Sequence, residues 1–271
     1  MSDHATQVYA LGADEEETAR LRRQSEELRP EAEALLARIG LRPGQSAVDL
    51  GCGPSGILGL LSAAVGAPGK VVGIDADAAH VAAAGRFAAT LGNVSVLLGD
   101  ARHTGLPGAT FDLVHARTLL ATVPAPAEVV AEMTRLARPG GWIACQEPDV
   151  EHAVCYPPLP EWDRLVELFL AGFSRTGADP LIGRRLPAML WQAGLADVTV
   201  TVHAGCYPVG HSRRDLLPDL VRSLRPVIIG LGLAGEGELA RLDRTVRGHL
   251  ADPRVLMMPH LLVTAVARNP R

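Results

Sequence analysis

Glycines and carboxylates at regular positions are the residues of this 271-residue chain whose spacing points to chemistry. Gly51, Gly53 and Gly56 follow a short apolar run that ends in Asp49 and Leu50. Glycine permits positive φ angles and lets a ligand approach the backbone closely. The order therefore predicts a strand, a tight turn and a helix, with the free N–H groups of the helix start facing a ligand in the turn.

Two kinds of ligand compete for this turn. The spacing Gly51-x-Gly53-x-x-Gly56 matches the dinucleotide fingerprint, which would make the protein an NAD(P)-dependent oxidoreductase. Asp49 argues for the other kind, because a carboxylate there repels a pyrophosphate and attracts a ligand that carries an ammonium or sulfonium group. The turn alone leaves both interpretations open.

The elements needed to position this turn come from an alternation of apolar strand-like runs and helical segments. Strands are expected at residues 46–50, 70–74, 94–98, 111–115 and 142–146, and helices at 57–65, 78–91 and 126–137. This alternation predicts parallel strands joined by right-handed helical crossovers. Such sheets bind ligands at the carboxyl ends of their strands, where Asp75, Asp100 and Glu147 stand.

The segments before and after this region do not follow the alternation of strands and helices. Residues 14–39 predict two helices with a break near Arg29, because Pro30 interrupts the pattern. After Glu147 we expect helices at 162–173, 183–193, 212–224 and 236–250, and strands at 197–203 and 256–266. The stretch between those two strands is too long for a hairpin turn. We therefore expect one domain over 1–271, with an N-terminal helical lid at about 1–40 and helical insertions at about 150–180 and 205–255.

Composition narrows the functional classes. The net charge of −4 predicts no nucleic-acid partner, and no apolar window is long enough to predict a membrane span. The N-terminus lacks the pattern of a signal peptide, and the four cysteines show no metal-ligand spacing. We expect a cytoplasmic protein with free thiols, no metal and a small-molecule partner; the sequence leaves open whether it is a homodimer.

Taken together, the motifs resemble the class I S-adenosylmethionine (SAM)-dependent methyltransferases, in a small-molecule, natural-product branch. Asp49-x-Gly51-x-Gly53 looks like motif I, Phe111-Asp112-Leu113-Val114 like the signature of strand four, and Leu136-Ala137-Arg138-Pro139-Gly140-Gly141 like the entry to strand five. One departure is Ser55, which stands where the family often has a glycine. The resemblance implies an α/β, Rossmann-like, doubly wound seven-stranded sheet, mostly parallel with the last strand antiparallel, plus a helical lid.

The same resemblance implies SAM as the cofactor and assigns roles to individual residues. These are Asp75 with Ala76 at the ribose, Asp100 with Ala101 at the adenine, Gly51 and Gly53 at the methionyl part, Arg117 at the carboxylate, and Tyr9 and Gln24 in the lid. Simpler roles stay open beside these. Asp75 suits a helix cap, Asp100 a turn and Arg117 a surface ion pair, while Tyr9 and Gln24 suit packing within the lid. Asp49 would order the loop amides or offset the ammonium group.

Methyl transfer needs a general base only when the nucleophile keeps its proton. Glu147, at the carboxyl end of strand five, is the first candidate, for substrate orientation or proton removal, and His152 in the following loop is the second. A structural carboxylate that holds a loop is the alternative for Glu147. His115 lies within strand four and suits a buried core histidine.

The sequence thus predicts a SAM-dependent methyltransferase that acts on an O, N or C nucleophile of a small molecule. Specialised metabolism is the setting that the natural-product branch implies. Two alternatives remain: an NAD(P)-dependent oxidoreductase, and a methyltransferase-like protein that binds SAM but catalyses another step, such as a cyclisation.

Overall fold

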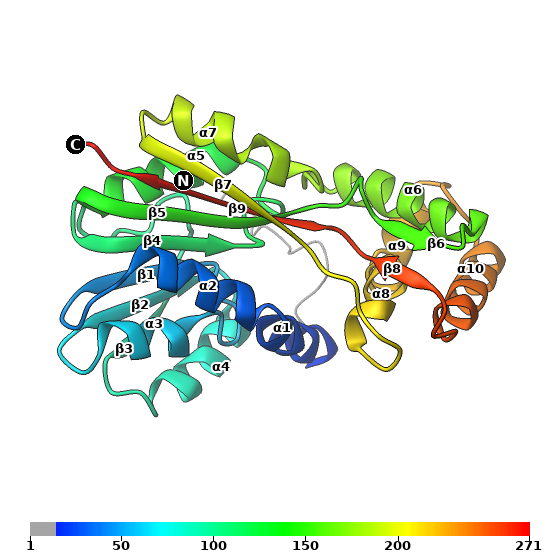
Figure 1. Ribbon diagram of the computed structural model, residues 1–271, viewed down its shortest axis with the longest axis horizontal. Coiled ribbons are helices and arrows are strands. Elements are labelled where there is room, and N and C mark those ends of the chain that lie inside the picture. Colours follow the sequence, from blue (N-terminus) through cyan, green and yellow to red (C-terminus); the bar gives the residue numbers. More distant parts are fainter. Residues whose placement is uncertain (1–14) are drawn as a thin grey trace, which may run out of the picture. The chain divides into compact units, whose positions relative to one another are not determined.

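The computed structural model describes residues 15–271, and these residues divide into two compact units (Figure 1). The larger one, here called the sheet unit, comprises residues 15–148 together with 181–203 and 262–271. The smaller one, the helical unit, comprises residues 149–180 and 204–261. The expected insertions at 150–180 and 205–255 lie within the helical unit, and the single-domain interpretation stays a prediction.

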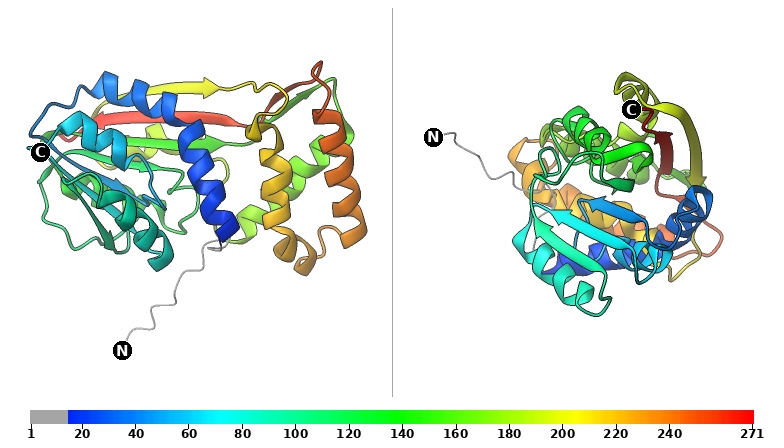
Figure 2. Two further views of the ribbon diagram at one scale, coloured as in Figure 1. Left: turned by 90° about the horizontal axis from the view of Figure 1, so that it is seen from below. Right: turned by 90° about the vertical axis from the view of Figure 1, so that its left-hand side faces the viewer.

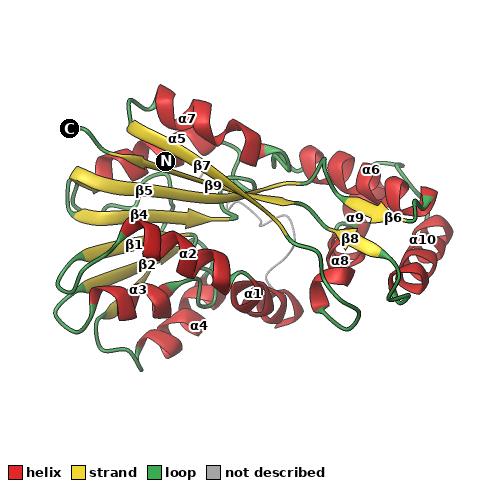
Figure 3. Ribbon diagram, in the orientation of Figure 1, coloured by secondary structure: helices red, strands yellow, loops and turns green. Residues whose placement is uncertain are grey.

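A seven-stranded sheet with the order β3-β2-β1-β4-β5-β9-β7 forms the sheet unit (Figure 3). Its strands are β1 (Ser46–Leu50), β2 (Lys70–Asp75), β3 (Val94–Leu98), β4 (Phe111–Arg117), β5 (Ala137–Asp149), β7 (Ala196–Ala204) and β9 (Leu261–Arg268). The five neighbouring strands β3, β2, β1, β4 and β5 pair in parallel. β9 runs antiparallel to β5, since Gly140 N–H donates to Asn269 O and Asn269 N–H donates to Gly141 O. The predicted fold class is confirmed.

Helices cover both faces of this sheet (Figure 2). The helices of the sheet unit are α1 (Glu15–Glu27), α2 (Arg29–Ile39), α3 (Leu58–Val65), α4 (Ala78–Ala88), α5 (Pro126–Leu136), the 3₁₀ turn η1 (Ile182–Arg185) and α7 (Leu186–Gln192). The apolar sides of α2 and α3 pack on one face, against residues such as Ala47 and Leu113. The apolar sides of α5 and α7 pack on the other, against Val48 and Val114. Neighbouring residues of one strand point to opposite faces, so the continuous apolar runs are buried on both sides.

Local signals explain where several helices begin and end. The break between α1 and α2 falls at Leu28, next to Pro30, as the proline predicted. Gly40 closes α2 with a φ of 68°, a left-handed conformation that glycine adopts without a steric penalty. Asp77 caps α4, because its side chain accepts hydrogen bonds from the N–H groups of Ala79 and His80.

The helical unit has a hydrophobic core of its own, built around residues such as Trp162, Phe169 and Met257. Its elements are β6 (Val154–Tyr156), α6 (Pro160–Arg175), the 3₁₀ turn η2 (Ser212–Asp215), α8 (Leu216–Ser223), α9 (Arg225–Gly230), α10 (Glu236–Leu250) and β8 (Leu256–Met258). β6 and β8 form a separate antiparallel pair. No helix in the described residues of either unit is long and apolar enough to cross a membrane.

The observed elements differ from the predicted ones in three places. The single strand expected at 256–266 is two strands in different sheets, β8 and β9, because Pro259 between them has no N–H group for a ladder. β5 is longer than the expected 142–146, since its first residues pair with β4 and with the segment after β9. The short elements α9 and β6 were not predicted, being too brief to show a period.

Candidate functional site

The glycine turn lies between β1 and α3 and has the positive φ angles that its glycines permit. Gly51, Gly53 and Gly56 have φ angles of 66°, 56° and 48°. A Cβ atom on Gly51 would lie 2.7 Å from Leu119 Cδ1, and one on Gly56 would lie 2.7 Å from Cys52 O. At Gly53 a Cβ atom would meet nothing within 4 Å, so the space beside this residue is open. The turn therefore presents bare backbone to that space.

Asp49 binds the end of this turn through its side chain. Its side chain is buried, and its Oδ2 accepts a hydrogen bond from Ile57 N–H at 3.3 Å. Its Oδ1 lies 2.7 Å from Nδ1 of His115, on the neighbouring strand β4. Of the two roles that the sequence left open for Asp49, these contacts support the ordering of the loop amides.

Asp75, the last residue of β2, is joined directly to the turn. Its Oδ2 accepts a hydrogen bond from Gly53 N–H at 2.7 Å, and its Oδ1 accepts one from Asp77 N–H at 2.9 Å. His80 Nδ1 is 3.5 Å from the same Oδ1. Asp77, not Asp75, caps the helix that follows, so the cap alternative for Asp75 is wrong. Sequence reasoning missed Asp77, although an aspartate directly before a helical run is a typical N-cap.

Asp100 follows β3 by two residues and binds a neighbouring cation. Its carboxylate accepts hydrogen bonds from Arg102, including Nη2 at 2.6 Å and the backbone N–H at 2.8 Å. The Arg102 side chain, opposed by partial burial, lowers the pKa of Asp100. Ala101 beside it is buried in the core of the sheet, whereas Ala76 at the end of β2 is exposed. The turn role of Asp100 is visible in these contacts, and its predicted contact with adenine stays a prediction.

Glu147 is buried in β5 and holds the loop that follows β4. Oε1 accepts hydrogen bonds from the N–H groups of Leu119 at 3.0 Å and Leu120 at 2.9 Å, and Oε2 accepts one from Ala121 at 3.1 Å. Burial raises the pKa of Glu147 to about 8, although the three N–H groups act in the opposite direction. Because Leu119 also packs against Gly51, Glu147 supports the glycine turn through this loop. These contacts favour the structural alternative for Glu147, and its catalytic role stays a prediction.

Helix α1 is fastened to the turn and to the end of β4 by polar contacts. Ser25 Oγ donates to Gly56 O at 2.5 Å, and Arg117 Nη2 donates to Ser25 Oγ at 3.0 Å. Gln24 Nε2 is 3.4 Å from Thr118 Oγ1. Arg117 therefore binds the helix of the expected lid, and its predicted contact with the cofactor carboxylate stays a prediction. Ser25 was missed, because serine in a helix carries no signal of its own.

Two other predicted residues belong to different parts of the chain. Tyr9 lies outside the described residues. His152 is exposed in the turn between β5 and β6, in the helical unit. In the described part of the chain, no group of three or more histidine, cysteine, aspartate or glutamate side chains is placed to hold a metal ion.

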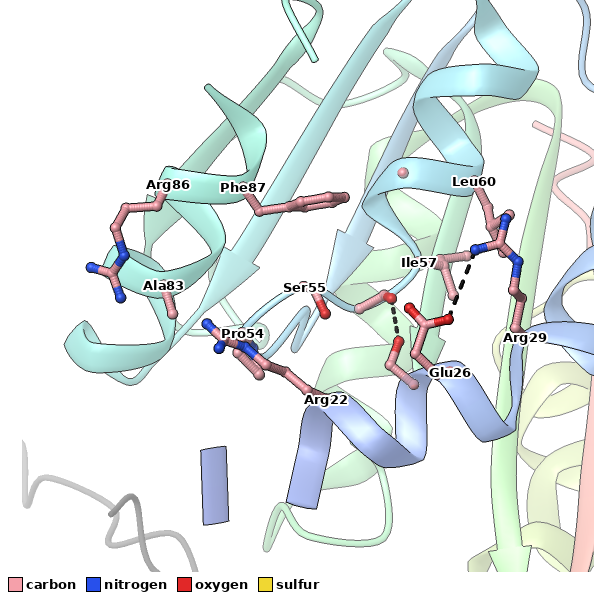
Figure 4. A pocket seen from close by; sticks show the side chains of 13 residues that line it. Arg22, Glu26, Arg29, Pro54, Ser55, Ile57, Leu60, Ala83, Arg86 and Phe87 are labelled. Atoms are coloured by element: carbon pink, nitrogen blue, oxygen red, sulfur yellow. Dashed lines mark hydrogen bonds and ion pairs between the residues drawn. The ribbon is translucent and has the colours of Figure 1, made fainter. Parts of the chain in front are cut away.

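A groove of about 570 Å³ runs beside the glycine turn (Figure 4). One wall is α1, which contributes Arg22 and Glu26, and the opposite wall is α4, which contributes Arg86 and Phe87. Pro54, Ser55, Gly56 and Ile57 belong to its lining as well. The outer side of the turn is thus reached from solvent, while its inner side rests on Asp49.

Asp75 and the glycine turn fit the cofactor that the resemblance implies. A carboxylate with two oxygens has about four acceptor positions, and the contacts of Asp75 with Gly53, Asp77 and His80 use three, which leaves capacity for a ribose hydroxyl. The open space at Gly53 suits close approach of a ligand to the backbone. Among the described residues, Asp75, Gly51 and Gly53 would hold SAM, with Asp100 and Ala101 beyond them at the next strand end.

Comparison with known proteins agrees with this site. The sequence profile of the family described as "Methyltransferase domain" matches residues 48–145. Nocamycin O-methyltransferase of Saccharothrix syringae is 40% identical over 136 residues, which are 49% of this chain and 47% of that protein. Demethylmenaquinone methyltransferase of Shouchella clausii is 30% identical over 196 residues, 63% of this chain and 78% of that protein.

The fold of this chain also resembles that of a solved structure. The structure of a Bacillus halodurans C-125 protein classified as a methyltransferase superposes with a TM-score of 0.60 at 17% identity, covering 88% of this chain and 98% of that one. The chain spans about half the length of the first curated relatives it matches. It belongs to the class I SAM-dependent methyltransferases. This membership decides against the oxidoreductase that the glycine spacing alone allowed.

Proposed function

We propose that the protein transfers the methyl group of SAM to an O, N or C nucleophile of a small molecule, in specialised metabolism. The observation that carries this proposal is the hydrogen bond from Gly53 N–H to Asp75, which joins the glycine turn to the carboxylate at the end of β2. Such a carboxylate accepts charge-assisted hydrogen bonds from a diol. It is suited to a ribose, and it would repel a phosphate at the same place.

The chemistry that SAM supplies when bound is an electrophilic methyl group. The work left to the chain is to hold the cofactor and the acceptor in line, at near-contact distance, and to keep water away. Asp75 orients the ribose side, and the backbone at Gly51 and Gly53 bounds the methionyl side. Glu147 keeps the loop at Leu119 against Gly51, so that this side of the pocket stays closed.

Proton removal from the acceptor needs a general base only if the acceptor atom keeps its proton. Both oxygens of Glu147 already accept amide hydrogen bonds, and its side chain is fully buried. His152 has an exposed imidazole and is the more accessible candidate base. A base is dispensable if the acceptor atom is an amine or an enolate that has already lost its proton.

We further propose that the helical unit determines which acceptor the protein accepts, and that residues 1–40 act as a lid. A separate hydrophobic core in residues 149–180 and 204–261 supports this, because such a unit can vary without disturbing the sheet. The named relatives are a nocamycin O-methyltransferase and a demethylmenaquinone methyltransferase. By analogy, the acceptor is proposed to be a small molecule and not a nucleic acid, in the cytoplasm. A homodimer remains a prediction.

Calorimetric titration with S-adenosylhomocysteine (SAH), SAM and NAD tests the cofactor. The expected result is saturable binding of SAH and SAM and none of NAD; the reverse would refute the proposal. Incubation with SAM and candidate metabolites, followed by mass spectrometry, tests transfer. Methylated product and SAH should appear in equal amounts. Substrate turnover without SAH would instead support a cyclisation.

A further inference from the structure

His115 is a buried imidazole that the proposed chemistry does not use. It lies in β4 with a solvent exposure of 0%, and its Nδ1 is 2.7 Å from Asp49 Oδ1. Its Nε2 is also buried, and within residues 15–271 the structure shows no hydrogen-bond partner for that atom. Asp49 is therefore the group through which the imidazole can act.

The strand register brings this pair together. Asp49 stands directly opposite His115 in the parallel pairing of β1 with β4. Both side chains lie on the sheet face that buries Ala47, Leu113 and Ala144. A polar pair in such surroundings costs free energy unless its members bond well to each other, and an apolar residue at position 115 would fill the same space. The imidazole is thus a local exception within an apolar core, placed against one particular carboxylate.

Asp49 links His115 to the glycine turn, because one carboxylate contacts both. While Oδ1 faces His115, Oδ2 accepts the hydrogen bond from Ile57 N–H at the end of the turn. The same Oδ2 lies so close to Gly56 that a Cβ atom there would collide with it. A rotation of the carboxylate would therefore release the Ile57 amide. The His115 contact opposes that rotation.

We propose that His115 is a positioning residue for the cofactor, which acts by fixing Asp49 and, through it, the turn at residues 51–57. Nδ1–H donates to Oδ1, so that Oδ2 stays directed at Ile57. The inference rests on the proposed function, because it takes this turn to hold SAM. No proton transfer to the acceptor is assigned to His115.

The test is the affinity for SAH, measured by calorimetry on the full chain, which requires no knowledge of the acceptor. His115→Asn places an amide N–H near the position of Nδ1 and keeps the donor for Asp49. His115→Gln places its amide farther out, near the position of Nε2, and His115→Leu has no donor. We expect Gln and Leu to weaken SAH binding about tenfold, and Asn to stay within about threefold of the native protein, as a charge-assisted hydrogen bond implies.

Leu113→Val is the matched control, because Leu113 is a buried residue of the same strand and face that makes no polar contact. It should lower the melting temperature and leave SAH affinity unchanged. In an Asp49→Ala background, His115→Leu should cause no further loss of affinity, since the two residues act as one unit.

Equal affinities of the Asn and Gln variants would overturn the proposal, and so would additive effects with Asp49→Ala. A loss of affinity in Leu113→Val as large as in His115→Leu would also overturn it, since general loosening would then explain the result. The comparison of His115→Asn with His115→Gln tests the positioning role even if His115→Leu does not fold. Failure of the native protein to bind SAH would refute the proposed function itself.

Discussion

Replacing Glu147 by glutamine should change stability in a pH-dependent way. Burial raises the pKa of Glu147 from 4.5 to about 8 in the folded protein, so the folded state holds a proton that the unfolded chain releases. The stability that this proton contributes is fully present below pH 4.5 and is lost as pH rises through 8. The slope is at most about 1.4 kcal/mol per pH unit, which amounts to a few kcal/mol over the whole range.

The glutamine variant lacks this titration but carries a constant defect. Its amide group puts a donor or a single oxygen where two oxygens now accept three N–H groups, which costs about 1–3 kcal/mol. We therefore expect Glu147→Gln to be less stable than the native protein at pH 5. The difference should shrink or reverse by pH 9. Equilibrium urea unfolding at several pH values measures it.

Glu132→Gln is the control with the opposite behaviour. Burial favours protonation of Glu132, but hydrogen bonds from Arg135 and Thr104 outweigh it and lower its pKa to about 2. Its contribution to stability is present above pH 4.5 and is lost only as pH falls toward 2. The difference between this variant and the native protein should thus stay constant from pH 5 to 9. A constant or growing difference for Glu147→Gln over the same range would refute the reasoning about burial.

Three further predictions concern the turn and the helical unit. Asp75→Ala should weaken SAH binding by about 1–3 kcal/mol, because it removes the acceptor for ribose and for Gly53 N–H; unchanged calorimetric affinity would contradict the assignment. Gly56→Ala should destabilise the protein by about 1–3 kcal/mol, since φ is 48° and Asp49 leaves no room for a methyl group. A melting temperature equal to that of the native protein would argue against this strain. Arg214→Met should speed hydrogen exchange in residues 204–261, because Arg214 donates to the carbonyl oxygens of Tyr207, Leu250 and Val255. Equal exchange rates in native and variant protein would show that these carbonyls need no such partner.

The sheet was predictable because its signals are local. The apolar runs before Asp49 and Asp75 and the glycines between them follow each other closely along the chain, so spacing alone predicts these elements. The break at Pro30 is visible for the same reason, since proline acts on its own helix.

The contacts within the site were not predictable to the same degree. Glu147 and Leu119 are 28 residues apart, and Asp49 and His115 are 66 apart, so only strand order brings each pair together. The sequence placed Glu147 near the carboxyl end of β5, but spacing could not reveal the three backbone amides that its carboxyl group binds. Short elements such as β6 and α9 escaped because their formation depends on packing against distant residues.

The route of the chain between the two units has a consequence for how such a protein diversifies. The described chain crosses from one unit to the other at residues 148, 180, 203 and 261. Each segment of the helical unit therefore leaves the sheet and returns to it, and the sheet strands on either side keep their partners. Insertions and deletions within 149–180 or 204–261 would change the surface of the helical unit and leave the register of the seven-stranded sheet unaltered. Proteins that descend from one ancestral sheet could thus acquire different substrate specificities through changes in these two segments alone.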